Sequence, residues 1–394
     1  MSIIFFDPAD SRKTLLPLTY TRPISEIRIG VLTISEKWCA QLDTTHYGYD
    51  TEEYLSNVFP KIKADTQTLW INATVLPTND LVEAIQALGS HEALMQKGLV
   101  LALKGESQDA VINKKSFERE IHVIRYPWDI FLQNGREIAS DYAFVTSNRN
   151  SYPLNDPHTI TYGEDIFIEE GASIKAAILN AEGGPIYIGK NAEVQEGSII
   201  RGPFALCEGS SLRMGCKIRG DSTVGPYSKV GGEVSNSVIF GNSNKAHDGY
   251  LGNSVIGEWC NLGAGTNNSN LKNNYEPVKM WDYQSHQFEP TGLQFCGLIM
   301  GDHTKTGIGS MFNTGTTVGV SANIFGSGFP RQIIPSFSWG GARGFITYEF
   351  QKAVDTIKKV MERRNIDMKE AEIEILKHVF DNTSEIRNWQ KQRK

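Results

Sequence analysis

Aliphatic residues recur every six positions through the middle of the chain. Eight of them follow one another without a gap: Ile188, Val194, Ile200, Leu206, Leu212, Ile218, Val224 and Val230. The phase slips by two residues around Glu233 and resumes at Val238, Tyr250, Ile256 and Leu262; after an insertion over 267–298 it returns at Met300, Thr306, Phe312, Val318 and Ile324. A period of six fits neither an α-helix nor a simple alternating strand.

The six-residue period does fit short strands joined by tight turns, with one inward aliphatic side chain in each strand. Glycine directly follows many of the anchors, where a turn needs positive φ. Three such units close one triangular coil, so residues about eighteen apart stack in adjacent coils. The pattern resembles the left-handed parallel β-helix of hexapeptide-repeat acyltransferases. A β-sandwich with fortuitous spacing is the alternative, and eight consecutive matches count against it.

The two flanks of this solenoid have different patterns. Residues 1–150 alternate strand-like and helix-like pieces, which predicts a small α/β domain, and the polar stretch "SNRNSYPLNDP" predicts a linker. The solenoid is then expected over 151–338. In the tail, residues 339–394, apolar side chains at Ile346, Phe350, Val354, Ile357 and Met361 have helical spacing. Asp367 with Glu370 predicts a capping box that opens a second helix.

Composition narrows the class of protein. A length of 394 residues favours two or more domains, and a net charge of −6 without a basic segment argues against nucleic acid as a partner. No apolar run approaches the ~18 residues of a membrane span, and the start lacks the features of a signal peptide. The five cysteines are scattered and contain no CxxC pair. We therefore expect a cytoplasmic protein with reduced thiols and no membrane partner.

Candidate chemistry gathers where the six-residue phase is irregular. His247 lies in such a tract, Glu233 lies inside the preceding slip, and Asn270 opens the insertion. Irregular positions place side chains at the rim of a prism instead of inside it. Acetylation of an amino sugar needs a base near neutral pH, a carboxylate that orients it and a donor for the oxyanion. The three residues supply these three chemistries.

The tract "NKAHDGYLGNSVIGEWCNLGAGTNNSN" is similar to the acetyltransferase motif of a bifunctional bacterial family, which acetylates glucosamine 1-phosphate and then uridylylates it. The resemblance implies that His247 is the base, that Tyr250 contacts substrate and that Asn270 belongs to the acetyl-transfer site. It also implies that the backbone of Ala264 contacts acetyl-CoA. Glu233 approximates the acidic partner, one residue out of register. Lys272 and Lys279 stand close to the place of the family's substrate lysine.

The first 150 residues lack the glycine-rich loop that opens the nucleotidyltransferase domain of that family, since no glycine occurs before Gly30. Arg12, Arg22 and Arg28 could neutralise a triphosphate. The segment "LLPLTYTRP" resembles the arginine-plus-proline loop of sugar nucleotidyltransferases. Asn72 occupies roughly the place of their metal-binding aspartate, and a carboxamide would hold Mg²⁺ more weakly than a carboxylate does. A degenerate domain kept for folding or regulation is the alternative.

Three hypotheses follow for the whole chain. The leading one is a homotrimeric enzyme of sugar-nucleotide biosynthesis that uses acetyl-CoA, a sugar 1-phosphate, a nucleoside triphosphate and Mg²⁺. The second is a trimeric regulatory or scaffold protein with a degenerate nucleotidyltransferase domain. The third is a metal-dependent β-helix carbonic anhydrase, which requires convergence of three histidines such as His247, His286 and His303.

Overall fold

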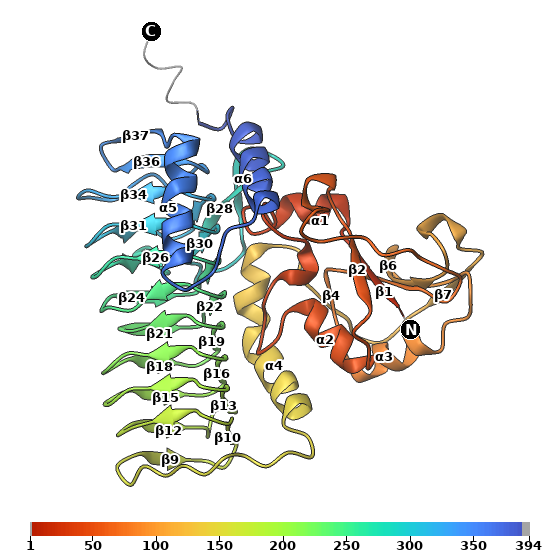
Figure 1. The fold of residues 1–394 in the computed structure, drawn as a ribbon, viewed down its shortest axis with the longest axis horizontal. Coiled ribbons are helices and arrows are strands. Elements are labelled where there is room, and N and C mark those ends of the chain that lie inside the picture. The colour runs from red at the N-terminus through yellow and green to blue at the C-terminus, as the bar shows by residue number, and fades with distance from the viewer. Residues whose placement is uncertain (1, 388–394) are drawn as a thin grey trace. The chain divides into compact units, whose positions relative to one another are not determined.

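The computed structural model describes residues 2–387 of the chain. The chain forms two compact units: Met1–Ile27 with Leu32–Asp129, and Arg28–Val31 with Ile130–Lys394. Helix α4 (Pro127–Val145) carries the chain from the first unit into the second. The expected α/β domain, parallel β-solenoid and C-terminal helices are all present, which confirms the predicted fold class (Figure 1).

The first unit is built on a mixed six-stranded sheet with the order β2-β1-β3-β6-β5-β7. Its strands are β1 (Ile3–Phe6), β2 (Tyr47–Asp50), β3 (Leu69–Asn72), β5 (Glu92–Gln96), β6 (Leu99–Lys104) and β7 (Asn113–Ser116), with β4 (Val75–Leu76) and β8 (His122–Val123) as a separate pair. Its helices are α1 (Ala9–Thr14), α2 (Ile34–Gln41) and α3 (Asn79–Gln86), with short 3-10 turns η1 (Ile24–Glu26), η2 (Glu53–Leu55) and η3 (Gln108–Ala110). Strand β1 is apolar and buried throughout because it lies between two parallel neighbours, β2 and β3.

The second unit is a three-sided parallel β-solenoid. Sheet I contains β10 (Ile166–Ile168), β13 (Ile186–Ile188), β16 (Phe204–Leu206), β19 (Ser222–Val224), β22 (Val238–Ile239), β25 (Val255–Ile256), β30 (Leu298–Met300), β33 (Thr316–Val318) and β35 (Ile333–Ile334). Sheet II contains β11 (Ser173–Ile174), β14 (Glu193–Val194), β17 (Ser211–Leu212), β20 (Lys229–Val230), β23 (Asn244–Lys245), β26 (Asn261–Leu262), β31 (Lys305–Thr306), β34 (Asn323–Ile324), β36 (Ser338–Gly341) and β37 (Gly344–Thr347). Sheet III contains β9 (Ile160–Tyr162), β12 (Ile178–Asn180), β15 (Ile199–Arg201), β18 (Lys217–Arg219), β21 (Glu233–Ser235) and β24 (Tyr250–Gly252), followed by the separate pair β27 (Asn267–Asn268) and β32 (Met311–Phe312).

The interior of the solenoid is the predicted aliphatic column. All eight consecutive anchors from Ile188 to Val230 are buried, with no more than 2% of any side chain exposed. Two anchors beyond the slip are wrong by one residue. Ile239 and Leu251 belong to the core cluster in place of Val238 and Tyr250, because strands β22 and β24 turn the later residue inward.

The slip around Glu233 is a shortened corner. Four residues join sheet II to sheet III after β14, β17, β23 and β26, whereas only Gly231 and Gly232 join β20 to β21. A Cβ on Gly231 would lie 2.6 Å from the carbonyl oxygen of Ala246, and one on Gly232 would lie 2.6 Å from that of Gly249. Glycine is therefore required for the short corner to pass under the next coil.

Helices lie along sheets I and II of the solenoid. Asn134 of α4 donates to the carbonyl oxygen of Asp221 at 2.9 Å, and Thr223 donates to the Asn134 side chain at 3.1 Å. At the other end, α5 (Phe350–Glu362) and α6 (Glu370–Asn382) follow the β36–β37 hairpin (Figure 1).

The tail corrects two predictions about its helices. Ile346 lies in β37 and is 53% exposed, so it belongs to a strand and not to the first helix. The second helix begins at Glu370, with Lys369 at the N-cap, and Glu372 accepts the Lys369 N–H at 2.7 Å. Asp367 and Glu370 therefore do not form the cap. Between residues 2 and 387, no helix is long and apolar enough to cross a bilayer.

Candidate functional site

His247 lies on the four-residue corner that joins β23 to β24 and is exposed to solvent. The neighbouring corner in the stack is the shortened one at Gly231 and Gly232, since β20 pairs with β23 and β21 pairs with β24. The His247 corner therefore overhangs a coil that is two residues shorter. This step in the solenoid wall leaves His247 and Asp248 open to a ligand.

Two of the predicted site residues are direct strand partners. Glu233 of β21 is in register with Tyr250 of β24 on sheet III, and the two strands are adjacent in Figure 1. Arg219 of β18 forms an ion pair with Glu233 at 3.2 Å, and 67% of the Arg219 side chain is exposed. The carboxylate of Glu233 is thus paired on the outer face of sheet III with a solvent-exposed cation.

Asn270 joins this group from the start of the insertion. Its amide nitrogen donates to the hydroxyl of Tyr250 at 2.9 Å and to the side-chain oxygen of Asn253 at 2.7 Å. Burial raises the pKa of Tyr250, and the hydrogen bond from Asn270 partly offsets that effect. Tyr250 therefore remains a neutral phenol near pH 7. The structure brings Glu233, Tyr250 and Asn270 together, with His247 three residues before Tyr250.

The carboxamides of Asn267 and Asn268 bridge β24 and β27. The side-chain oxygen of Asn267 accepts from the Tyr250 N–H at 2.7 Å, and the Asn268 side chain both accepts from and donates to the backbone of Gly252, at 2.9 and 3.0 Å. Side chains thus replace the strand pairing that continues elsewhere on sheet III. Sequence reasoning missed these contacts, although the cluster of Asn267, Asn268 and Asn270 was their signal.

Lys245 is a second residue that sequence reasoning missed. It is in register with Val230 and points into the solenoid, where only 3% of it is exposed. Its ammonium donates to the carbonyl oxygens of Gly231 and His247, both at 3.0 Å. Burial lowers the pKa of this ammonium to about 8. The signal in the sequence was a lysine six residues before the buried Leu251.

The other residues implied by the resemblance are Ala264, Lys272 and Lys279, and they lie on three different segments of the second unit. Ala264 lies on the corner stacked next to that of His247, and its neighbour Gly265 donates to the carbonyl oxygen of Asp248 at 2.9 Å. Lys272 donates to the carbonyl oxygen of Pro277 at 3.0 Å within the insertion. Lys279 is exposed in β28 (Lys279–Asp282), which pairs with β29 (Gln287–Pro290) as a hairpin.

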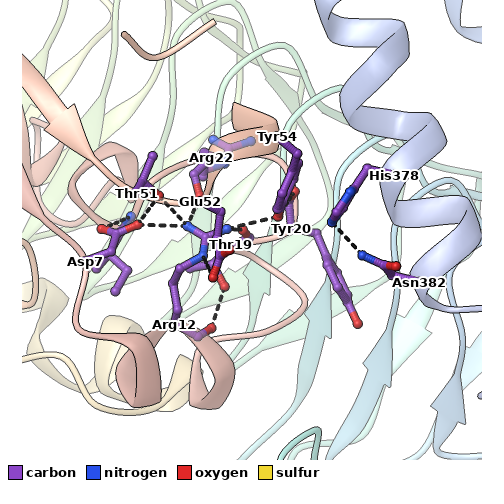
Figure 2. A network of polar contacts seen from close by, with 11 residues as sticks. Asp7, Arg12, Thr19, Tyr20, Arg22, Thr51, Glu52, Tyr54, His378 and Asn382 are labelled. Atoms are coloured by element: carbon purple, nitrogen blue, oxygen red, sulfur yellow. Dashed lines mark hydrogen bonds and ion pairs between the residues drawn. The ribbon is translucent and has the colours of Figure 1, made fainter. Parts of the chain in front are cut away.

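Arg12 lies inside the first unit, where 7% of its side chain is exposed (Figure 2). Its guanidinium pairs with the buried carboxylate of Asp7 at 2.8 Å and donates to the hydroxyls of Thr51 and Tyr54, each at 3.0 Å. It also donates to the carbonyl oxygens of Thr19 and Arg22. A direct contact with a phosphate would have to break these bonds. In this arrangement Arg12 braces the loop that contains "LLPLTYTRP".

The remaining candidates of the first 150 residues are also tied to the protein. Arg22 is buried and Arg28 donates to the carbonyl oxygen of Val31; Arg28 belongs to the second compact unit. The Asn72 oxygen accepts from both the N–H and the hydroxyl of Thr74, at 3.0 and 2.7 Å, and its nitrogen donates to Val100. Asn72 therefore stabilises the turn after β3 and does not present an open oxygen ligand for Mg²⁺.

The three histidines of the carbonic anhydrase hypothesis lie on separate parts of the second unit. His247 is on a corner between sheets II and III, His303 is on a corner between sheets I and II, and His286 is in the turn between β28 and β29. Within residues 2–387, no group of three or more histidine, cysteine or acidic side chains could hold a metal ion. This arrangement does not support the third hypothesis.

Comparisons with known proteins confirm the resemblance that the sequence suggested. Residues 3–150 match a family described as sugar nucleotidyl transferase. A bifunctional protein GlmU of Methanocaldococcus jannaschii is 34% identical over 173 residues, which cover 43% of this chain and 39% of that protein. The GlmU of Trichodesmium erythraeum is 25% identical over 319 residues, covering 74% of this chain and 56% of that protein. The first of these matches thus spans about two-fifths of its relative's length.

Solved acyltransferases also align with part of the chain. The polySia specific acetyltransferase NeuO is 16% identical with a TM-score of 0.27, and the alignment covers 50% of this chain and 86% of NeuO. The Arabidopsis UDP-N-acetylglucosamine acyltransferase is 11% identical with a TM-score of 0.26, covering 59% of this chain and 97% of that one. These TM-scores are too low to equate the folds.

Proposed function

We propose that the chain is a transferase of sugar-nucleotide biosynthesis that acetylates an amino-sugar 1-phosphate at the His247 corner. The observation that carries this proposal is the contiguous group of Glu233, Tyr250 and Asn270 on the outer edge of sheet III, next to the overhanging corner of His247. Similarity to bifunctional GlmU proteins supports the same reaction. Glucosamine 1-phosphate is the proposed acceptor.

In the proposed reaction the amine nitrogen of the sugar attacks the thioester carbonyl of acetyl-CoA. The imidazole of His247 takes the proton that the amine loses, the C–S bond breaks, and the CoA thiolate leaves and is protonated. An imidazole suits this task because histidine is the side chain that ordinarily exchanges a proton near neutral pH. Glu233, with its exposed partner Arg219, would contact the sugar or reorient toward the imidazole when substrate displaces the ion pair.

Asn270 and Tyr250 are proposed to hold the acetyl-transfer geometry. Both donors of the Asn270 amide are occupied, one by the hydroxyl of Tyr250 and one by Asn253. Donation to the oxyanion requires Tyr250 to release Asn270, and the phenol then becomes available to the substrate. Acetyl-CoA is proposed to lie along the corners after β23 and β26, where Ala264 would meet it.

For the first 150 residues we propose nucleotidyl transfer from UTP or another nucleoside triphosphate to the sugar 1-phosphate. The family match over residues 3–150 supports this half. Arg12 and Arg22, both buried in the first unit, would act by shaping the loop after β1 that receives the triphosphate. Any Mg²⁺ would be held mainly by the phosphate oxygens of the triphosphate.

We propose a homotrimer that assembles through sheet III. Ile160, Ile178 and Ile199 form one row across β9, β12 and β15, and Ile160 and Ile199 are 50% and 43% exposed. A partner's wall would cover this apolar row and place a second chain beside the His247 corner. No disulfide joins the cysteines within residues 2–387, and we propose a cytoplasmic location, where thiols stay reduced.

One experiment separates this proposal from a non-catalytic scaffold. Purified protein is given acetyl-CoA, glucosamine 1-phosphate and each nucleoside triphosphate in turn, while free thiol and pyrophosphate are measured independently. Thiol release that depends on the amino sugar supports the acetyltransferase. Pyrophosphate release with pre-acetylated sugar phosphate supports the nucleotidyltransferase. A folded protein that releases neither product favours the scaffold.

A further inference from the structure

A cavity of about 390 Å³ lies between the outer face of sheet II and the last turns of α5. Four cationic side chains line it: Lys229 and Lys305 from the sheet, and Arg363 and Arg364 from the end of the helix. The remaining lining residues are neutral, and no carboxylate is among them. The cavity lies entirely within the second compact unit, and it contains none of the residues assigned above to acetyl or nucleotidyl transfer.

The floor of the cavity is a single row of side chains in register. Lys229 pairs with Asn244, Asn244 with Asn261, and Asn261 with Lys305 across β20, β23, β26 and β31. Adjacent strands are about 4.8 Å apart, so the two lysines stand roughly 14 Å apart with two carboxamides between them. The row therefore has a positive charge at each end and neutral hydrogen-bonding groups in the middle.

The roof of the cavity is formed by the end of α5. The guanidinium of Arg364 donates to the carbonyl oxygen of Tyr227 and to the side-chain oxygen of Asn244, the latter at 3.2 Å, and it lies over the ring of Trp259. Burial lowers the pKa of Arg364, and the like charge of Arg363 lowers it further. The two guanidinium groups thus stay close together although their charges repel.

No acidic side chain lines the cavity to neutralise its positive charge. No ion pair joins Lys229, Lys305, Arg363 or Arg364 to an acidic side chain among the described residues. The Lys305 ammonium instead donates to the carbonyl oxygen of His303 at 3.0 Å, and burial lowers its pKa. Clustered like charges in a partly desolvated cavity repel one another, and an anion of matching size relieves that repulsion.

We propose that this cavity is a second small-molecule site, which binds a phosphorylated compound with two or more negative charges. The phosphate oxygens would accept from the lysine at one end of the row and from the arginines of α5, and hydroxyl groups would bond to Asn244 and Asn261. Arginine forks suit phosphate geometry. Because α5 supplies the roof, ligand binding would also fasten the tail to the solenoid.

The test is calorimetric titration of the full-length protein with inorganic pyrophosphate at constant ionic strength. Wild-type protein binds pyrophosphate, and Arg363→Glu and Lys229→Glu each weaken the affinity about 10- to 100-fold, as expected for loss of a charge-assisted contact. Both side chains are exposed, so these variants fold. Arg343→Glu, an exposed cation in the turn between β36 and β37, is the matched control and keeps the wild-type affinity.

Absence of binding to the wild type, or equal affinity in Arg363→Glu and wild type, overturns the proposal. Loss of pyrophosphate affinity in His247→Ala also overturns it, because the anion would then lie at the catalytic corner. Competition titrations with glucose 1-phosphate and with acetyl-CoA identify the kind of phosphate compound that the cavity prefers. The proposed acetyl transfer is measured separately, as thiol release. The result of the pyrophosphate titration therefore does not decide the acetyl-transfer proposal, and thiol release does not decide the proposal of an anion site.

Discussion

The ammonium nitrogen of Lys245 lies 3.0 Å from the carbonyl oxygen of His247, inside a column that is largely apolar. The same ammonium bonds Gly231 on the shortened corner of the preceding coil. The buried ammonium of Lys245 therefore links the corner that carries His247, the proposed base, to the shortened corner at Gly231 and Gly232. A charged group at this position costs free energy unless it is bonded, and the two carbonyl oxygens supply those bonds.

Replacement of Lys245 by methionine should change how stability depends on pH. The folded state releases the Lys245 proton near pH 8, whereas an unfolded lysine keeps its proton to about pH 10.4. Between these values the unfolded chain binds more protons, so rising pH stabilises the fold through this group, by on the order of 3 kcal/mol in total. Below pH 8 both states are protonated and the cost of burial is present in full.

The measurement is urea unfolding of wild type and Lys245→Met at several pH values from 7 to 10. The difference between the two proteins cancels the contribution of Cys260, whose raised pKa acts in the opposite direction above pH 9, whereas Cys216 is electrostatically coupled to Lys245. The wild type should gain stability relative to the variant as the pH rises. A difference that stays constant across this range would show that the lysine is not buried as a cation.

Asn270→Ala should lower the turnover of acetyl transfer more than it weakens substrate binding. The amide is expected to donate most strongly once the oxyanion has formed, and loss of one such donor costs about 10²–10³ in kcat. Steady-state kinetics should show that fall with a nearly unchanged KM for the sugar phosphate. Asn274→Ala, at an exposed position of the same insertion, serves as the control. An Asn270→Ala enzyme with normal kcat and raised KM would assign Asn270 to ground-state binding.

Arg12→Ala should destabilise the first unit. The substitution leaves the carboxylate of Asp7 buried without its cation, which typically costs about 3–5 kcal/mol, that is roughly 10²–10⁴ in the folding equilibrium. Lys13→Ala removes an exposed neighbouring cation and should have little effect. Thermal melts followed by circular dichroism make the comparison. An Arg12→Ala protein with an unchanged Tm and lost nucleotide binding would make Arg12 a direct phosphate ligand.

Ile199→Arg should dissociate the proposed trimer. The side chain lies in the middle of sheet III, in register with Ile178 and Lys217, and outside the aliphatic column. An arginine there is tolerated by the monomer but would be buried between chains. Light scattering should report a trimer for wild type and for Ile112→Arg, an equally apolar exposed site in the first unit, and a monomer for Ile199→Arg. A trimeric Ile199→Arg would exclude sheet III as the interface.

The solenoid could be predicted from the sequence because a closed prism allows one inward side chain per strand. The anchors from Ile188 to Val230 report that constraint directly, and all of them are buried. The six-residue pattern fails after Val230. The corner between β20 and β21 is two residues shorter than its neighbours, and the inward positions of β22 and β24 then fall one residue later than the period predicts. The six-residue period therefore predicts Tyr250 in the interior, whereas Leu251 occupies it.

The sequence names candidate site residues but not their contacts. Residue chemistry predicts that Glu233 orients His247, and strand register places Glu233 beside Tyr250, three residues after His247. Sequence likewise cannot reveal that Arg12 turns inward toward Asp7, or that Lys245 points into the column. The orientations of these two side chains depend on hydrogen-bond partners that are distant along the chain or belong to the backbone.

Release of free thiol from acetyl-CoA by His247→Ala tests the central claim most directly. His247 is exposed on a corner and fills no part of the aliphatic column, so the variant should keep the wild-type Tm. If the imidazole is the base, thiol release that depends on glucosamine 1-phosphate should fall by roughly 10²–10⁴-fold. Pyrophosphate release with pre-acetylated sugar phosphate should stay unchanged. A folded His247→Ala protein that transfers acetyl groups at the wild-type rate would contradict the account.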